Sequence, residues 1–196
     1  MIVSQNSLSY YLVIHNKQFP IMDNNLVVVY LSVLLVLLGA AGWFVLRQVF
    51  RTRKTELTLS RLQNQLSQGK GTTQEHFELG SLYLSKNLAV QAIQQFQQAL
   101  KAAEAEGETN LAPIYNAMGY AYFTQEQFDV AIRTYKEALK LKEDYVVALN
   151  NLGHAYERKN LVAPALDAYE KVLKHEPKND TAKRRANSLR KRVAIA

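Results

Sequence analysis

The most apolar stretch of the sequence is residues 26–46, LVVVYLSVLLVLLGAAGWFVL, which contains no charged side chain. As a helix these 21 residues would be about 31 Å long, which matches a hydrocarbon core of roughly 30 Å. A core helix of a soluble protein would carry a polar face over such a length. A cleaved signal peptide would have a shorter apolar region behind a basic segment. The pattern therefore predicts a permanent transmembrane helix over residues 26–46.

The next segment, residues 55–68, is mostly polar and carries one stripe of leucines at spacings of three and four. The stripe consists of Leu59, Leu62 and Leu66. We expect this segment to continue the transmembrane helix and to place the stripe against the first following repeat or against a partner protein. A Gly-Lys-Gly sequence then ends the helix. Thr72, with Glu75 three residues later, is typical of a capping box. Residues 47–72 are thus predicted to form a basic juxtamembrane helix and linker.

Three segments downstream repeat one pattern of apolar and small residues. Gly119 and Gly153 are 34 residues apart, and Gly80 precedes Gly119 by 39, which is one period plus a five-residue insert. Each segment has the 3.6-residue periodicity of two consecutive amphipathic helices. A period of 34 residues indicates helix pairs that bury their apolar faces against one another. The repeats are predicted at residues 73–106, 112–145 and 146–179.

Small residues mark the place where the two helices of each predicted repeat cross. The first helix contributes a glycine and the second an alanine, which allows a close approach of the two backbones. The expected pairs are Gly80 with Ala92, Gly119 with Ala131, and Gly153 with Ala165. Aromatic side chains of the second helices are expected to fill the space beside them; these are Phe96, Tyr135 and Tyr169.

The last segment, residues 180–196, is predicted to form a capping helix and tail. Asp180 is the expected N-cap, and Ala182, Ala186 and Leu189 share the face that would cover the third repeat. The predicted fold class is therefore all-α. It consists of a single N-terminal transmembrane helix, an α-solenoid of three repeats over residues 73–179, and a C-terminal capping helix.

The repeat pattern resembles the tetratricopeptide repeat (TPR) family. The resemblance implies that the first helices line a concave groove that binds peptides of partner proteins. It places in this groove Phe77, Ser81, Leu84, Asn116, Tyr120, Phe123, Asn150, His154, Glu157, Arg158 and, from the capping helix, Arg184. Some TPR proteins hold the carboxylates of chaperone C-termini with Lys, Asn and Arg. The matching positions here are Phe77, Ser81, Ala117, Val147 and Asn151, so binding of chaperone tails is disfavoured.

The order of the segments adds a narrower resemblance. The sequence Met-Asp-Asn-Asn from Met22, the apolar span, RQVFRTRKTE, SRLQNQL and the three repeats resemble the TPR family of hypothetical chloroplast reading frame thirty-seven. That resemblance implies a cyanobacterial or plastid thylakoid protein that supports assembly or stability of photosystem I. Its partners would be photosystem I subunits or assembly factors. Two alternatives stay open: a membrane-bound receptor for protein targeting, and a structural tether for another membrane complex.

The part of the chain before the span is expected to be a disordered extension over residues 1–25. It shows no clear periodicity, and Met22 is a second candidate for the start of translation.

The net charge of +7 is concentrated in two flanks of the chain. Residues 47–72 carry a surplus of five positive charges and residues 174–196 a surplus of six, whereas residues 73–173 have a net charge of −4. Arg47, Arg51, Arg53 and Lys54 directly follow the apolar span. The positive-inside bias therefore predicts that the repeats lie on the cytoplasmic or stromal side of the membrane. An acidic middle disfavours a nucleic-acid partner.

Catalytic and metal-binding patterns are missing from the sequence. It contains no cysteine, and its histidines do not lie at metal-ligand spacing with a carboxylate. They are His15, His76, His154 and His175. No glycine-rich phosphate loop is found. We therefore expect a protein that binds other proteins, without enzymatic activity, metal or cofactor.

Overall fold

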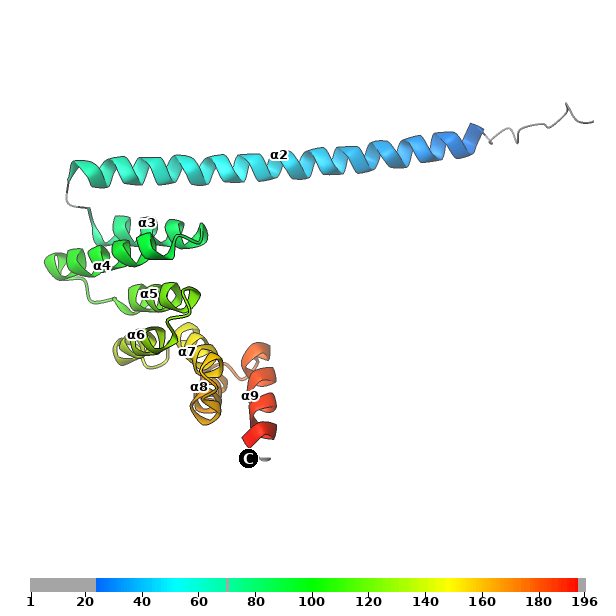
Figure 1. The fold of residues 1–196 in the computed structure, drawn as a ribbon. Helices are drawn as coiled ribbons and strands as arrows, with labels where there is room; N and C mark the ends of the chain where they lie inside the picture. Colours follow the sequence, from blue (N-terminus) through cyan, green and yellow to red (C-terminus); the bar gives the residue numbers. More distant parts are fainter. Residues whose placement is uncertain (1–23, 70, 194–196) are drawn as a thin grey trace, which may run out of the picture. The chain divides into compact units, whose positions relative to one another are not determined.

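The computed structural model describes residues 24–69 and 71–193, and every regular element within them is an α-helix (Figure 1). The predicted extension over residues 1–25, with Met22, lies outside the described residues except for Asn24 and Asn25. The chain divides into two units, residues 1–54 and 55–196.

The first described helix, α2 (Asn24–Gln68), has 45 residues and runs through both the apolar span and the leucine stripe. The large apolar side chains between residues 26 and 46, except that of Val27, are exposed; Leu35 is 70% and Trp43 72% exposed. Among the described residues, α2 is the one helix long and apolar enough to cross a membrane, a test that a signal sequence near an N-terminus also passes.

The leucine stripe packs on the first repeat. Leu62 is only 1% exposed, whereas Leu57 on the other face of α2 is 72% exposed. Gln63 Nε2 donates a hydrogen bond to the Tyr83 hydroxyl at 2.9 Å. Lys86 forms an ion pair with Glu56 nearby. Of the two places expected for the stripe, the structure therefore assigns it to the first repeat.

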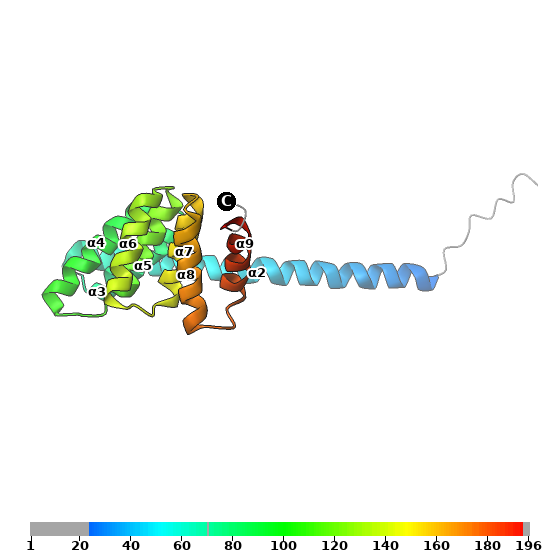
Figure 2. The ribbon, with the colours of Figure 1, turned by 90° about the horizontal axis from the view of Figure 1, so that it is seen from below.

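Three pairs of antiparallel helices follow in chain order (Figures 1 and 2). The pairs are α3 (Thr73–Ser85) with α4 (Ala89–Glu106), α5 (Ala112–Thr124) with α6 (Phe128–Leu141), and α7 (Val146–Arg158) with α8 (Val162–His175). Each helix contacts the next, and the first helices also contact one another, α3 with α5 and α5 with α7. The first helices therefore form a common layer.

Local signals in the sequence explain where these helices begin and turn. The capping box is confirmed: Thr72 Oγ1 accepts from the Glu75 N–H, and the Glu75 carboxylate accepts from the Thr72 N–H at 2.9 Å. The turn inside each pair holds one residue in the left-handed region, with φ between 56° and 60°. These residues are Asn87, Glu126 and Asn160. Asparagine tolerates this conformation better than most residues, and glutamate is the less usual choice.

The nearest groups to the three glycines are aromatic rings, which corrects the expected glycine–alanine pairing in part. A Cβ on Gly119 would lie 2.7 Å from the ring of Tyr135, and one on Gly153 would lie 2.9 Å from the ring of Tyr169. At Gly80 the Phe96 ring is also nearer, at 2.7 Å, than the Ala92 carbonyl oxygen, at 3.2 Å. The glycine therefore makes room for the aromatic ring of the second helix.

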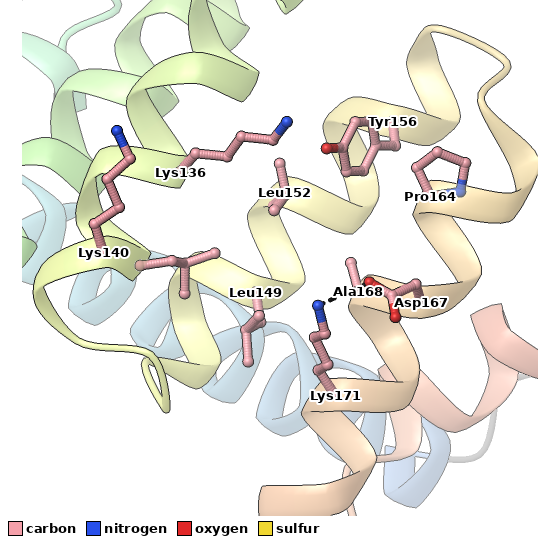
Figure 3. A pocket seen from close by; sticks show the side chains of 10 residues that line it. Lys136, Lys140, Leu149, Leu152, Tyr156, Pro164, Asp167, Ala168 and Lys171 are labelled. Carbon is pink, nitrogen blue, oxygen red and sulfur yellow. Dashed lines mark ion pairs between the residues drawn. The ribbon is translucent and has the colours of Figure 1, made fainter.

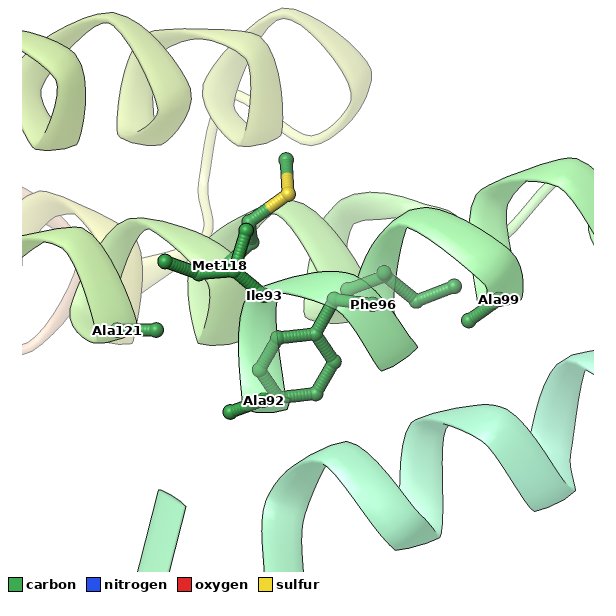
Figure 4. Close-up of a cluster of buried hydrophobic side chains, with 7 residues drawn as sticks. Ala92, Ile93, Phe96, Ala99, Met118 and Ala121 are labelled. Carbon is green, nitrogen blue, oxygen red and sulfur yellow. The ribbon is translucent and has the colours of Figure 1, made fainter. Parts of the chain in front are cut away.

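The rings beneath the glycines form the centre of the core. Phe96, Tyr135 and Tyr169 are at most 2% exposed. Figure 4 shows the first cluster, in which Phe96 lies beside Ala92 and close to the α5 residues Met118 and Ala121. Small residues such as Ala99 and Ala138, both fully buried, let the next helix pair stack closely.

The last helix, α9 (Asp180–Val193), covers the third pair. Ala182, Ala186 and Leu189 are buried, as predicted. The expected cap at Asp180 is wrong, because Asn179 Oδ1 accepts the hydrogen bond from the Ala182 N–H at 3.0 Å. Residues 194–196 of the predicted tail lie outside the described residues.

Candidate functional site

The predicted groove residues lie on the layer of first helices. Phe77, Ser81 and Leu84 are on α3; Asn116, Tyr120 and Phe123 on α5; Asn150, His154, Glu157 and Arg158 on α7; and Arg184 on α9. The structure brings the residues of α5 and α7 together into one group. The α3 residues Phe77 and Leu84 pack against the first core cluster instead.

An aromatic cluster forms the centre of this group. The Phe123 ring stacks with Tyr120 at a centroid distance of 6.4 Å, meets His154 at 4.8 Å and contacts Phe128 edge-on at 5.4 Å. Tyr120 remains 46% exposed although its neighbour Phe123 is half-buried. Because three helices hold these rings, the cluster is a preformed apolar surface.

Arg158 borders the cluster. Its guanidinium carbon lies 4.7 Å from the centroid of Phe128 and 5.8 Å from that of Phe123. Its Nη2 is 3.1 Å from Glu126 Oε1, in the turn between α5 and α6. Stacking on a ring restricts the guanidinium, and the exposed pairing with Glu126 adds little, so the positive charge of Arg158 lies beside an apolar surface.

Glu157 is held from two sides. Its carboxylate accepts a hydrogen bond from the Tyr169 hydroxyl at 2.6 Å and pairs with Arg185 Nη1 at 3.2 Å. Burial and this bond raise the pKa of Tyr169. Glu157 therefore serves to fix α9 on the third pair, and it is Arg185, one position beyond the predicted Arg184, that joins the group.

Two asparagines link the first helices through an amide contact. Asn151 Nδ2 donates to Asn116 Oδ1 at 2.9 Å, between α7 and α5. Within residues 24–69 and 71–193, Asn150 Oδ1 is buried without a hydrogen-bond donor. Leaving such an acceptor unpaired costs about 1–3 kcal/mol.

The α3 residues are tied to the first core cluster. Phe77 lies 5.8 Å from the Phe96 ring and, with Leu84, packs against that cluster. Ser81 Oγ donates to the carbonyl oxygen of Phe77 at 2.8 Å. These side chains stabilise the first pair more than they offer free binding groups.

The residues that the sequence analysis missed come from turns and neighbouring positions. Phe128 begins α6 and Glu126 lies in the turn before it. Phe128 follows Phe123 by five residues, so a search for aromatic residues around the predicted turn would have found it.

His154 gives the site a pH-dependent contribution to stability. Burial lowers the pKa of His154, and Arg185 lowers it further. The unfolded chain therefore binds a proton at this ring more readily than the folded chain, so stability falls as the pH drops below about 6.5.

We expect the His154→Gln variant to lose less stability than the wild type between pH 7 and pH 5. Thermal unfolding of the full chain in detergent, followed by circular dichroism across this range, measures the difference. Identical pH dependence of the two proteins would contradict the assigned environment of His154.

Comparison with known proteins agrees with this architecture. Residues 110–160 match the family described as TPR repeat, and residues 146–179 match the family described as tetratricopeptide repeat. Among solved structures, the crystal structure of MamA superimposes with a TM-score of 0.66 at 21% identity, covering 74% of this chain and 82% of that one. At that identity the likeness shows the fold alone.

Three relatives extend the similarity beyond the repeats. The chloroplastic tetratricopeptide repeat domain-containing protein PYG7 of Arabidopsis thaliana is 38% identical over 85% of this chain, which spans 55% of that protein. The ycf37 protein of Cyanophora paradoxa is 34% identical, covering 86% of this chain and 97% of its own length. The ycf37 protein of Guillardia theta is 35% identical over 76% and 84% of the two chains.

These matches include most of the chain, and in the sequence the TPR solenoid follows a long apolar helix. The predicted resemblance is therefore confirmed, and the chain is a TPR protein of the ycf37/PYG7 family.

Proposed function

We propose that this protein is a membrane-anchored scaffold that binds partner proteins through the groove formed by α5 and α7. TPR repeats are generally non-enzymatic scaffolds for protein binding. The observation that carries the proposal is the aromatic cluster, in which the Phe123 ring contacts both the half-exposed Tyr120 on α5 and His154 on α7. Such rigid aromatic groups often dominate binding energy at protein interfaces.

The groove chemistry favours a peptide with apolar side chains. The rings of Tyr120 and Phe123 would contact those side chains, while the amides of Asn116 and Asn150 would bond the peptide backbone. The positive charge of Arg158 beside the rings would favour a carboxylate on the same peptide.

The anchor in this proposal is the apolar part of α2, residues 26–46. All of its large apolar side chains except that of Val27 are exposed, and an extended exposed apolar surface of this kind is unstable in water. Lipid would cover it on all sides. The basic residues Arg47, Arg51, Arg53 and Lys54 then favour a cytoplasmic or stromal position for residues 55–196.

The proposed client is photosystem I or one of its assembly factors, at the thylakoid membrane. This narrower role rests on family membership and on the segment order of the sequence, in which residues 26–46, 47–72, 73–179 and 180–196 act as anchor, linker, repeats and cap. The chloroplastic relative PYG7 supports a plastid or cyanobacterial setting.

Copurification with a tagged full chain from detergent-solubilised membranes tests the client class. We expect photosystem I subunits or their assembly factors at amounts well above an untagged control. Enrichment of precursor proteins instead would favour a targeting receptor, and enrichment of another membrane complex would favour a structural tether; either result would refute the photosystem role.

A further inference from the structure

A concave surface lies between the second helices α6 and α8, with α7 as its floor. It is a cavity of about 370 Å³ that the peptide groove does not use. Figure 3 shows its floor, formed by Leu149, Leu152 and Tyr156 of α7. At 100° per residue, these three side chains point almost opposite to Asn150 and His154, which face the groove.

Positively charged side chains surround this apolar floor. Lys136 and Lys140 come from α6 and Lys171 from α8, against a single acidic lining residue, Asp167. Lys136 Nζ lies 5.8 Å from the centroid of the Tyr156 ring. The lining therefore has a surplus of two positive charges around an apolar centre.

Two of the three lysines around the floor already form ion pairs, and other carboxylates could replace their partners. Lys171 Nζ pairs with Asp167 at 2.9 Å and Lys140 Nζ with Glu137 at 2.7 Å, and all four side chains are at least 47% exposed. Exposed pairs of this kind contribute little to stability, about 0–1 kcal/mol each. A partner carboxylate can replace Asp167 or Glu137 at small cost.

The corresponding place between the first and second repeats has different side chains. Equivalent residues are 39 positions apart between the first and second repeats and 34 between the second and third. Tyr115 therefore corresponds to Leu149, and Thr134 to Ala168. Larger residues therefore occupy the corresponding place between the first and second repeats.

We infer that this lysine-rimmed cavity binds an acidic segment of a partner protein that inserts one large apolar side chain. The apolar side chain contacts Leu149, Leu152 and Tyr156, and flanking carboxylates pair with the three lysines. A volume of about 370 Å³ is at the lower end of the range for binding pockets, which suits a single side chain. The surface is separate from the peptide groove, so the inference goes beyond the proposed function and does not depend on it.

Fluorescence anisotropy with defined peptides tests the inference. The probe is fluorescein-labelled Glu-Asp-Leu-Phe-Asp-Glu, and the protein is the full chain in nanodiscs of uncharged lipid. We expect the Lys136→Gln/Lys140→Gln variant to bind the probe roughly tenfold more weakly than the wild type, because two charge pairs are lost. The affinity of the wild type should fall as salt is raised.

The matched control is the Lys101→Gln/Arg133→Gln variant, which loses the same charge at the corresponding place between the first and second repeats. All four substituted side chains are exposed, so both variants should melt as the wild type does. The control should bind the probe normally. Equal weakening of both variants would show general charge attraction and overturn the inference. It would also be overturned if a probe with Ser-Ser in place of Leu-Phe bound equally well, or if the original probe did not bind.

Discussion

The Gly119→Leu variant is expected to lower the unfolding midpoint of the repeats by about 5–20 °C. A Cβ at this position would lie 2.7 Å from the Tyr135 ring, and Tyr135 is 1% exposed, so the ring has no free space into which to move. Overpacking of this kind costs about 1–3 kcal/mol, a large part of the 5–15 kcal/mol that stabilises a typical domain. Thermal unfolding of the full chain in detergent, followed by circular dichroism, measures the change.

The Gly69→Leu variant is the matched control for this prediction. The substitution is the same, but a Cβ on Gly69 would have no atom within 4 Å. Its unfolding midpoint should equal that of the wild type. An unchanged midpoint for Gly119→Leu would contradict the packing of glycine against the aromatic ring.

The second large effect is expected at the membrane. The Leu34→Arg/Leu37→Arg variant places two charges near the middle of residues 26–46, where each arginine costs about 2.5–3.5 kcal/mol in a lipid-inserted helix. We expect the wild type to stay in the membrane pellet after an alkaline carbonate wash and this variant to be released largely into the supernatant.

Leu57→Arg is the control for the membrane experiment. Leu57 is also exposed on α2 but lies beyond the apolar span, on the side of the repeats. This variant should remain in the pellet. Release of the wild type itself by carbonate would refute the transmembrane anchor.

The helices and the repeat architecture could be predicted because both depend on local periodicity. Spacings of three and four between apolar residues indicate each helix. The 34 residues between Gly119 and Gly153 give the length of one repeat, which is a pair of helices. The capping box at Thr72 and the buried face of α9 were predicted on the same basis and are confirmed.

Contacts between repeats were harder to predict. One position along a helix changes the direction of a side chain by 100°, which separates Arg184 from Arg185, the residue that pairs with Glu157. The contacts of Phe123 with His154 and of Asn116 with Asn151 join residues 31 and 35 positions apart, and a repeat pattern does not give their relative orientation.

The glycine–alanine pairing was only partly right, since Ala92 does contact Gly80 but a ring is the nearest group at all three glycines, and the reason is related. The pattern identified Gly119 as a place of close approach, but the identity of the approaching group depends on the rotation of α6 about its axis. That rotation brings the Tyr135 ring, and not Ala131, nearest to the glycine. Small residues in a repeat therefore locate a contact without identifying the partner side chain.

The central claim is that the groove formed by α5 and α7 binds the client protein. Copurification of the client with groove variants tests this claim most directly. The variants are Tyr120→Ala, which removes a half-exposed ring, and Asn116→Ala/Asn150→Ala, which removes two amides and little packing. Loss of an aromatic hot spot costs on the order of 2 kcal/mol, or about thirtyfold in affinity.

The comparison variant keeps the repeats and replaces residues 26–46 by an unrelated transmembrane helix. We expect both groove variants to stay folded, with a lower unfolding midpoint for Asn116→Ala/Asn150→Ala because Asn151 loses its acceptor. Both should lose most of the copurified client, while the helix replacement recovers it. Full recovery by both groove variants, together with loss of the client when residues 26–46 are replaced, would contradict the account and assign recognition to those residues.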